Sequence, residues 1–166
     1  MPTLDSTLLA QYQSVRETVG LLDYSSRGKI RVSGPDHVSF LHSMISNDVR
    51  ELEEWRGRYA TFLTPRGKMV CDFYFYKLPD FVLIDLDSSL LSRMMETLGK
   101  FIIMDDVSLE DASQDWGHLS LQGPRSGELI RRLVEIETPH EDLQVVALSW
   151  RGQSGWLVRR NELGPM

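Results

Sequence analysis

Acidic side chains beside aromatic residues are the groups of this sequence best placed to do chemistry. Asp72 lies inside the aromatic-rich run Met69 to Tyr76 (MVCDFYFY). A carboxylate is costly to bury in such a strand unless it is hydrogen-bonded or faces a wet cavity, so Asp72 is either a site residue or a structural acceptor. Asp85 and Asp87 alternate onto one face at the end of the next predicted strand. Asp87 is a candidate site residue, and it is also well placed to cap the helix that follows.

A thiol and an indole add to this set. Cys71 stands between apolar residues of the same strand, where a cysteine usually behaves as a small core hydrophobe and not as a reactive thiol. The run 152–156 (GQSGW) is typical of a hairpin turn followed by an aromatic residue. At a cavity mouth, the amide of Gln153 and the indole of Trp156 would suit a flat heteroaromatic ligand.

Several kinds of site have no support in the sequence. The four histidines form no H-x₃-H or HExxH pair, and the single cysteine has no partner at metal-ligand spacing, so we expect no protein metal site. There is no G-x-S-x-G elbow and no glycine-rich phosphate loop. The chain carries 18 Lys and Arg against 24 Asp and Glu, a net charge of −6, which argues against binding to nucleic acid.

The composition is typical of a folded protein in a reducing compartment. Apolar residues make up 42% and charged residues 25% of the 166 positions. The first residues lack the basic-then-apolar pattern of a secretory signal, and no apolar run approaches the roughly 18 residues of a membrane span. One cysteine cannot form an internal disulfide. We therefore expect a cytoplasmic protein that does not bind membranes.

Alternating helices and strands must position these residues. We expect helices over 6–19, 34–45, 89–98 and from 124 onward, and strands over 29–32, 58–64, 69–76, 81–86, 119–121, 145–150 and 155–159. Ser33 and Ser88 are expected to cap the second and third helices. The stretch 104–116, rich in acidic residues, is expected to be a solvated edge.

Two segments look like copies of one another. IRVSGPDHVSFL (30–41) and LSLQGPRSGELI (119–130) each combine a strand, a Gly-Pro pair and an amphipathic helix, 89 residues apart. This indicates a duplicated βα unit with pseudo-two-fold symmetry, the alternative being a chance Gly-Pro pair. The whole pattern favours an α+β fold, with a mixed or antiparallel sheet and packed helices.

Three blocks of sequence carry a family resemblance. GLLDYSSRGKIRVSGPDHVSFLHSMISNDV (20–49), LTPRGKMVCDFYFY (63–76) and LSLQGP (119–124) resemble, in order and spacing, the N-terminal folate-binding region of glycine-cleavage T-protein relatives. The resemblance implies an α+β folate-binding domain with tetrahydrofolate or a one-carbon derivative in a central cavity. We expect residues 1–166 to form one such domain, without the family's C-terminal β-barrel domain.

Two activities compete within that superfamily. Aminomethyltransferases take an aminomethyl group from a lipoyl carrier protein and deliver one carbon to tetrahydrofolate. The resemblance places Cys71 at the first aspartate of their G-G-x-x-D-D pattern, the key one, because the matching run here is GKMVCD (67–72). It places Asp87 at an asparagine that faces the pterin, and Gln153 at the glutamate of Y-T-G-E-x-G. We therefore assign no catalytic residue, and expect Asp72, Asp87, Gln153 and Trp156 to bind the folate.

The run LTPRGKM, without the aspartate pair, is closer to the YgfZ-type folate-binding proteins, which serve iron–sulfur cluster assembly or repair. Their K-G-C-Y-x-G-Q-E motif does not occur in this sequence. Our first hypothesis is a YgfZ-type tetrahydrofolate-binding protein without transferase chemistry, with iron–sulfur proteins as partners. The second is an aminomethyltransferase served by a lipoyl carrier protein. The third is a non-catalytic interaction module that uses the acidic stretch 105–115 and has no affinity for folate.

Overall fold

The computed structural model describes residues 5–134 and 136–160. Its helices are α1 (Ser6–Glu17), α2 (His37–Met44), α3 (Ser88–Gly99) and α4 (Ser126–Val134). Its strands are β1 (Gly20–Asp23), β2 (Gly28–Ser33), β3 (Arg56–Leu63), β4 (Met69–Lys77), β5 (Phe81–Leu86), β6 (Ser108–Asp111), β7 (Leu119–Gln122), β8 (Val145–Trp150) and β9 (Gln153–Val158). No described helix is both long and apolar enough to cross a bilayer.

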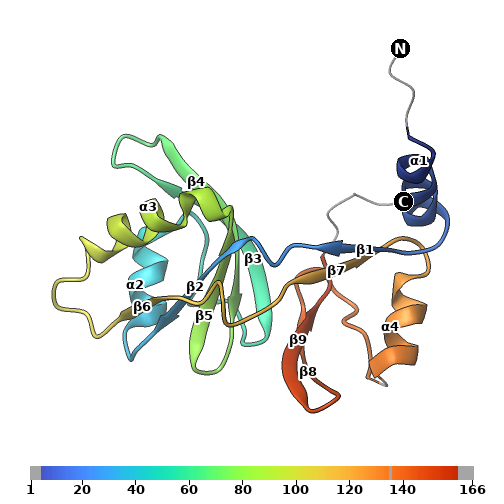
Figure 1. The fold of residues 1–166 in the computed structure, drawn as a ribbon. Helices are drawn as coiled ribbons and strands as arrows, with labels where there is room; N and C mark the ends of the chain where they lie inside the picture. The colour runs from blue at the N-terminus through green and yellow to red at the C-terminus, as the bar shows by residue number, and fades with distance from the viewer. Residues whose placement is uncertain (1–4, 135, 161–166) are drawn as a thin grey trace.

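The strands form antiparallel sheets, which confirms the predicted α+β class. One sheet has the strand order β3-β4-β5-β2-β6, and the pairs β1–β7 and β8–β9 form two smaller sheets. Figure 1 shows the large sheet with α2 and α3 in one half of the molecule, and the two small sheets with α1 and α4 in the other. The connections from β1 to β2 and from β6 to β7 join the halves.

Strand alternation gives the large sheet two different faces. On β4, Cys71, Phe73 and Phe75 are buried in one core cluster with residues of α2 and α3, such as Phe40 and Met94. The intervening residues of β4 point to the other side, which we call the helix-free face. Because side chains alternate along a strand, the odd-numbered residues of β4 point to the helices and the even-numbered residues, such as Asp72, point to the helix-free face.

The duplicated βα unit is confirmed. β2 leads into α2 and β7 leads into α4, each through a Gly-Pro turn. β1, which precedes β2, pairs with β7, whereas β6, which precedes β7, pairs with β2. The two copies therefore exchange partner strands, and this exchange ties the halves of the molecule together.

The glycine at each junction has the same role. Gly34 has φ +102° and Gly123 has φ +123°, a backbone region that favours glycine. A Cβ at Gly34 would strike the carbonyl oxygen of Asp106, and a Cβ at Gly123 that of Thr18. These carbonyl groups lie just before the partner strands β6 and β1, so each glycine permits a close backbone crossing.

Alanine at either junction glycine should therefore destabilise the protein to a similar extent. We expect Gly34→Ala and Gly123→Ala each to lower the free energy of unfolding by about 1–3 kcal/mol. Gly127→Ala is the control, because Gly127 lies inside α4 with open space around its Cα and should gain up to about 1 kcal/mol. Urea unfolding of the three variants measures this, and equal effects at all three positions would contradict the junction role.

Two predicted helix caps were wrong. Ser33 is held in the β-ladder as the last residue of β2, and α2 begins later, after Asp36. The carboxylate of Asp36 does not cap α2, since it accepts the backbone N–H of Asp106 instead (2.8 Å). Ser88 is already helical, and Asp87 is the residue that caps α3.

One other expectation needs correction, and one strand was not expected. The hairpin turn lies at Arg151 and Gly152, both with positive φ, so the run from Gln153 to Trp156 belongs to β9 and not to the turn. Strand β1 was not predicted, because its four residues are too few to show a period. The acidic stretch agrees with the expected solvated edge, because it includes the edge strand β6 with exposed side chains such as Glu110.

Candidate functional site

A hydrogen-bonded phenol and carboxylate stand on the helix-free face. Tyr59 of β3 and Tyr74 of β4 are cross-strand partners whose ring centres lie 5.4 Å apart, edge to face. The Tyr59 hydroxyl donates to Oδ2 of Asp72 at 2.9 Å, and this bond raises the pKa of Tyr59 above its usual value. Asp72 is exposed to solvent. The arrangement offers a ligand an oriented, negatively charged acceptor beside two aromatic rings.

A second carboxylate lies at the same end of the sheet. Tyr74 pairs with Asp85 and Phe73 with Leu86, so continuing this register by one residue sets Asp72 beside Asp87. Asp87 accepts the hydroxyl (2.6 Å) and the backbone N–H (2.9 Å) of Ser89, and these bonds lower its pKa. Its carboxylate is therefore engaged in capping α3.

Cys71 faces the opposite way. It is 2% exposed, and its Sγ lies 3.6 Å from Sδ of Met94 in α3. Burial is the main cause that raises the pKa of the Cys71 thiol to about 11, so the thiol is neutral and inert near pH 7. This confirms the interpretation of Cys71 as a small core hydrophobe. A ligand on the helix-free face would meet Asp72 and not Cys71.

Between the two halves lies a buried ion cluster that sequence reasoning missed. Asp85, 4% exposed, accepts Nε of Arg27 at 2.5 Å and Nη1 of Arg160 at 2.8 Å. Arg27 belongs to the β1–β2 connection, and Arg160 follows β9. The Arg160 guanidinium also lies 4.1 Å from the centre of the Tyr74 ring. The cluster joins three distant segments across the helix-free face.

Other polar groups around this cluster are withdrawn from water. Lys29 is 3% exposed and donates to the carbonyl oxygens of Ser25 (3.1 Å) and Arg27 (3.0 Å), while burial lowers its pKa. Burial also lowers the pKa of His118, and it raises the pKa of Tyr76 to about 12. The centre of the interface is therefore dry, which strengthens the ion pairs of Asp85.

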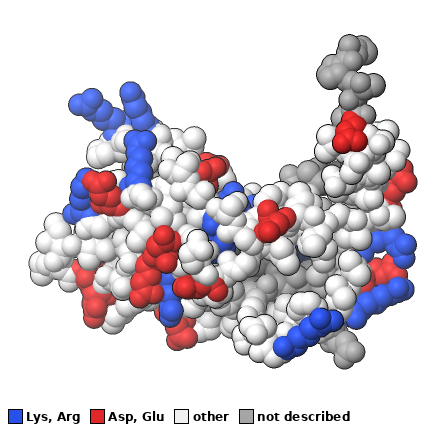
Figure 2. Space-filling model, in the orientation of Figure 1, with Lys and Arg blue, Asp and Glu red and all other residues white. Residues whose placement is uncertain are grey.

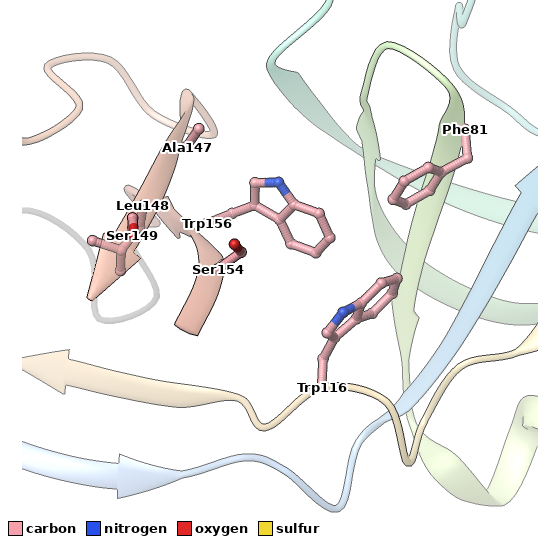
Figure 3. Close-up of a pocket in the computed structure, with 8 residues that line it drawn as sticks. Phe81, Trp116, Ala147, Leu148, Ser149, Ser154 and Trp156 are labelled. Carbon is pink, nitrogen blue, oxygen red and sulfur yellow. The ribbon is translucent and has the colours of Figure 1, made fainter. Parts of the chain in front are cut away.

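An aromatic pocket lies between β5, the β6–β7 connection and the β8–β9 hairpin (Figure 3). Its volume is about 540 Å³, within the range of ligand sites. The rings of Trp116 and Trp156 lie 5.0 Å apart, edge to face, and the ring of Phe81 lies about 6 Å from each. The lining residues are Phe81, Trp116, Ala147, Leu148, Ser149, Ser154, Gly155 and Trp156.

The four residues expected to bind the ligand thus do not lie in one place. Asp72 and Asp87 lie together at one strand end. Trp156 lies in the aromatic pocket with Phe81, which is six residues from Asp87 along β5, or about 20 Å. Gln153 is exposed at the first position of β9 and does not line the pocket. Within the described residues, no three His, Cys, Asp or Glu side chains gather as a metal site requires.

Comparison with known proteins gives consistent matches. The family described as "GCVT N-terminal domain" matches residues 2–158. The aminomethyltransferase of Staphylococcus epidermidis is 30% identical over 141 residues, which are 84% of this chain and 39% of that protein. The aminomethyltransferase of Exiguobacterium sibiricum is 30% identical over 139 residues, 82% of this chain and 38% of that protein.

The same fold occurs in a solved structure. The glycine cleavage system aminomethyltransferase T of Bartonella henselae aligns with a TM-score of 0.72 and 20% identity, over 85% of this chain and 39% of that chain. This chain therefore spans about two-fifths of the length of the proteins that it matches.

Proposed function

We propose a function for this chain, which belongs to the family of glycine-cleavage T-protein N-terminal domains. On that premise, we propose that it binds a reduced folate, tetrahydrofolate or a one-carbon derivative, on the helix-free face of the large sheet. The observation that carries this proposal is the exposed Asp72 carboxylate, held by the Tyr59 hydroxyl beside the Tyr74 ring.

The chemistry of the ligand supports this location. The amino-pyrimidine edge of a pterin presents N–H donors, and a carboxylate accepts them with charge, which makes the bonds stronger than neutral ones. The edge-to-face tyrosines offer apolar surface for the fused rings. The aminobenzoyl ring is joined to the pterin by a two-atom bridge, so it would lie beside the Tyr59–Asp72 pair, with Asp87 near it. The aromatic pocket around Trp156 lies about 20 Å away along β5. Trp156 and Gln153 are therefore separate candidates for folate contacts.

For the role of the protein we propose the YgfZ type: a cytoplasmic folate-binding protein that supports iron–sulfur cluster assembly or repair and does not transfer a one-carbon group itself. Two sequence features support it. The run LTPRGKM lacks the aspartate pair of the transferases, and Gln153 offers only a neutral amide where they carry a glutamate. Neutral hydrogen bonds to the pterin are weaker than charged ones.

Aminomethyl transfer to tetrahydrofolate is the second candidate, and the orientation of Cys71 favours it. Because Cys71 points into the core, cysteine at this position removes no acid from the helix-free face, where Asp72 still supplies one. The relatives compared above are named aminomethyltransferases. The third candidate, an interaction module at the acidic edge, predicts no folate binding at all.

Titration with tetrahydrofolate and 5-formyltetrahydrofolate, followed by tryptophan fluorescence and by melting temperature, tests the proposal. Asp72→Asn should weaken binding by about 10- to 100-fold, since it removes a charged hydrogen bond and keeps the shape. Asp80→Asn, an equal change of charge in the exposed β4–β5 turn, should leave affinity unchanged. Equal affinities of both variants and the parent chain would place the ligand elsewhere.

A transfer assay separates the two folate hypotheses. The parent chain is mixed with an aminomethylated lipoyl carrier protein and tetrahydrofolate, and methylene-tetrahydrofolate is measured. Under the first hypothesis folate binds and no product forms. Product that disappears in Asp72→Asn would establish the transferase.

A further inference from the structure

The end of the β3–β4 hairpin presents an apolar pair to solvent. Leu63 and Met69 are cross-strand partners directly below the turn and are 40% and 63% exposed. Two backbone hydrogen bonds close the turn: the N–H of Gly67 donates to the carbonyl of Thr64, and the N–H of Thr64 donates to the carbonyl of Lys68, both at 2.8 Å. The pair is therefore presented by a hydrogen-bonded turn.

Basic side chains surround this apolar pair. Arg66 and Lys68 are exposed in the turn, and Arg93 is exposed on the neighbouring helix α3, near enough for its charge to act on Cys71. Figure 2 shows basic side chains gathered over this hairpin and α3. Among the described residues, none of the ion pairs involves these three side chains. We call Leu63, Arg66, Lys68, Met69 and Arg93 the basic hairpin patch.

We propose that the basic hairpin patch is a docking surface for a protein whose contacting surface is acidic. A small apolar centre within a charged rim is the usual anatomy of a protein interface, and methionine and arginine are enriched there. A rigid turn lowers the ordering cost of association. The three cations steer an acidic partner to this end of a chain whose net charge, −6, repels it elsewhere.

Nucleic acid and anionic membranes fit the patch less well. Three cations neutralise few phosphates, and the acidic remainder of the chain opposes a long polyanion or an extended anionic bilayer. A folded acidic protein needs only a local match. The surface through which such a protein contacts this chain would be about as wide as the end of the β3–β4 hairpin.

The patch and the proposed folate site lie on opposite faces of the large sheet. Met69 and Asp72 are three residues apart on β4, or about 10 Å, and alternation points Met69 to the side of Cys71 and Asp72 to the helix-free face. Docking therefore does not rest on the proposed function.

A labelled peptide of about six glutamates is a suitable probe of acidic docking, because it imitates a local acidic surface and not a long polyanion. Fluorescence anisotropy at low salt is the measurement. We expect saturable binding that weakens as salt rises. The variant R66S/K68S/R93S should bind at least about 10-fold more weakly, in line with the loss of rim charges. The control R16S/R131S/R151S makes the same change in net charge at exposed sites elsewhere and should bind like the parent chain.

Three results would overturn the docking surface. One is a folded parent chain that does not bind the peptide. Another is equal weakening in both triple variants, because that would reflect net charge alone. The third is tighter binding, through the same three residues, of a duplex DNA of about 20 base pairs or of phosphatidylserine vesicles. Tetrahydrofolate titration of R66S/K68S/R93S should match the parent chain, so failure of docking and failure of folate binding are separable.

Discussion

Asp85→Asn is expected to lower the free energy of unfolding by about 3–5 kcal/mol. Asp85 neutralises the guanidinium groups of Arg27 and Arg160, whose side chains are only 27% and 15% exposed. An amide of the same shape keeps the packing and removes the negative charge, which leaves two cations close together in a dry interface that also contains Lys29. Breaking a buried pair by removing one partner is costly for this reason.

Urea unfolding at neutral pH measures the change. Glu96→Gln is the matched control, because Glu96 pairs with Lys100 on the exposed face of α3 at 2.7 Å, a distance similar to that of the Asp85 pairs. Exposed pairs contribute little, so this control should unfold like the parent chain. Equal stability of the two variants would mean that the Asp85 cluster is solvated and does not hold the halves together.

The sequence predicted the local elements of this fold better than their contacts. The repeated Gly-Pro units correctly indicated a duplication. Strand alternation put Asp85 and Asp87 on one face. It could not supply Arg27 and Arg160, because these partners lie 58 and 75 residues from Asp85 and have no periodic signal of their own.

The aromatic pocket shows the same limit. Trp156 was a candidate from its position near a hairpin, yet its ring partners Phe81 and Trp116 come from separate segments that only the tertiary fold brings together. For Cys71, two sequence arguments disagreed: apolar neighbours predicted a core residue, and the family resemblance placed it at a catalytic aspartate. The structure bears out the first, since Cys71 is buried in the core. The match of position 71 to the transferase aspartate stays a prediction.

Cys71→Asp tests that conclusion directly. If position 71 faced the folate, this substitution would restore a transferase-like carboxylate and tighten binding. The structure predicts instead a loss of at least about 3 kcal/mol of unfolding free energy at pH 7, because the new carboxylate would be buried beside Met94 and Phe73 without a partner. Folate affinity of the fraction that remains folded should not increase.

The loss should depend on pH in a definite direction. Burial raises the pKa of the new carboxyl group in the folded state above its unfolded value of about 3.9. The unfolded state therefore releases its proton first, so the penalty is small below about pH 4, grows as pH rises and levels off above the folded pKa. Cys71→Ser, polar but uncharged, should show no such dependence between pH 4 and 8. A Cys71→Asp variant that is as stable as Cys71→Ser across this range, and that binds tetrahydrofolate more tightly, would show that position 71 faces the ligand.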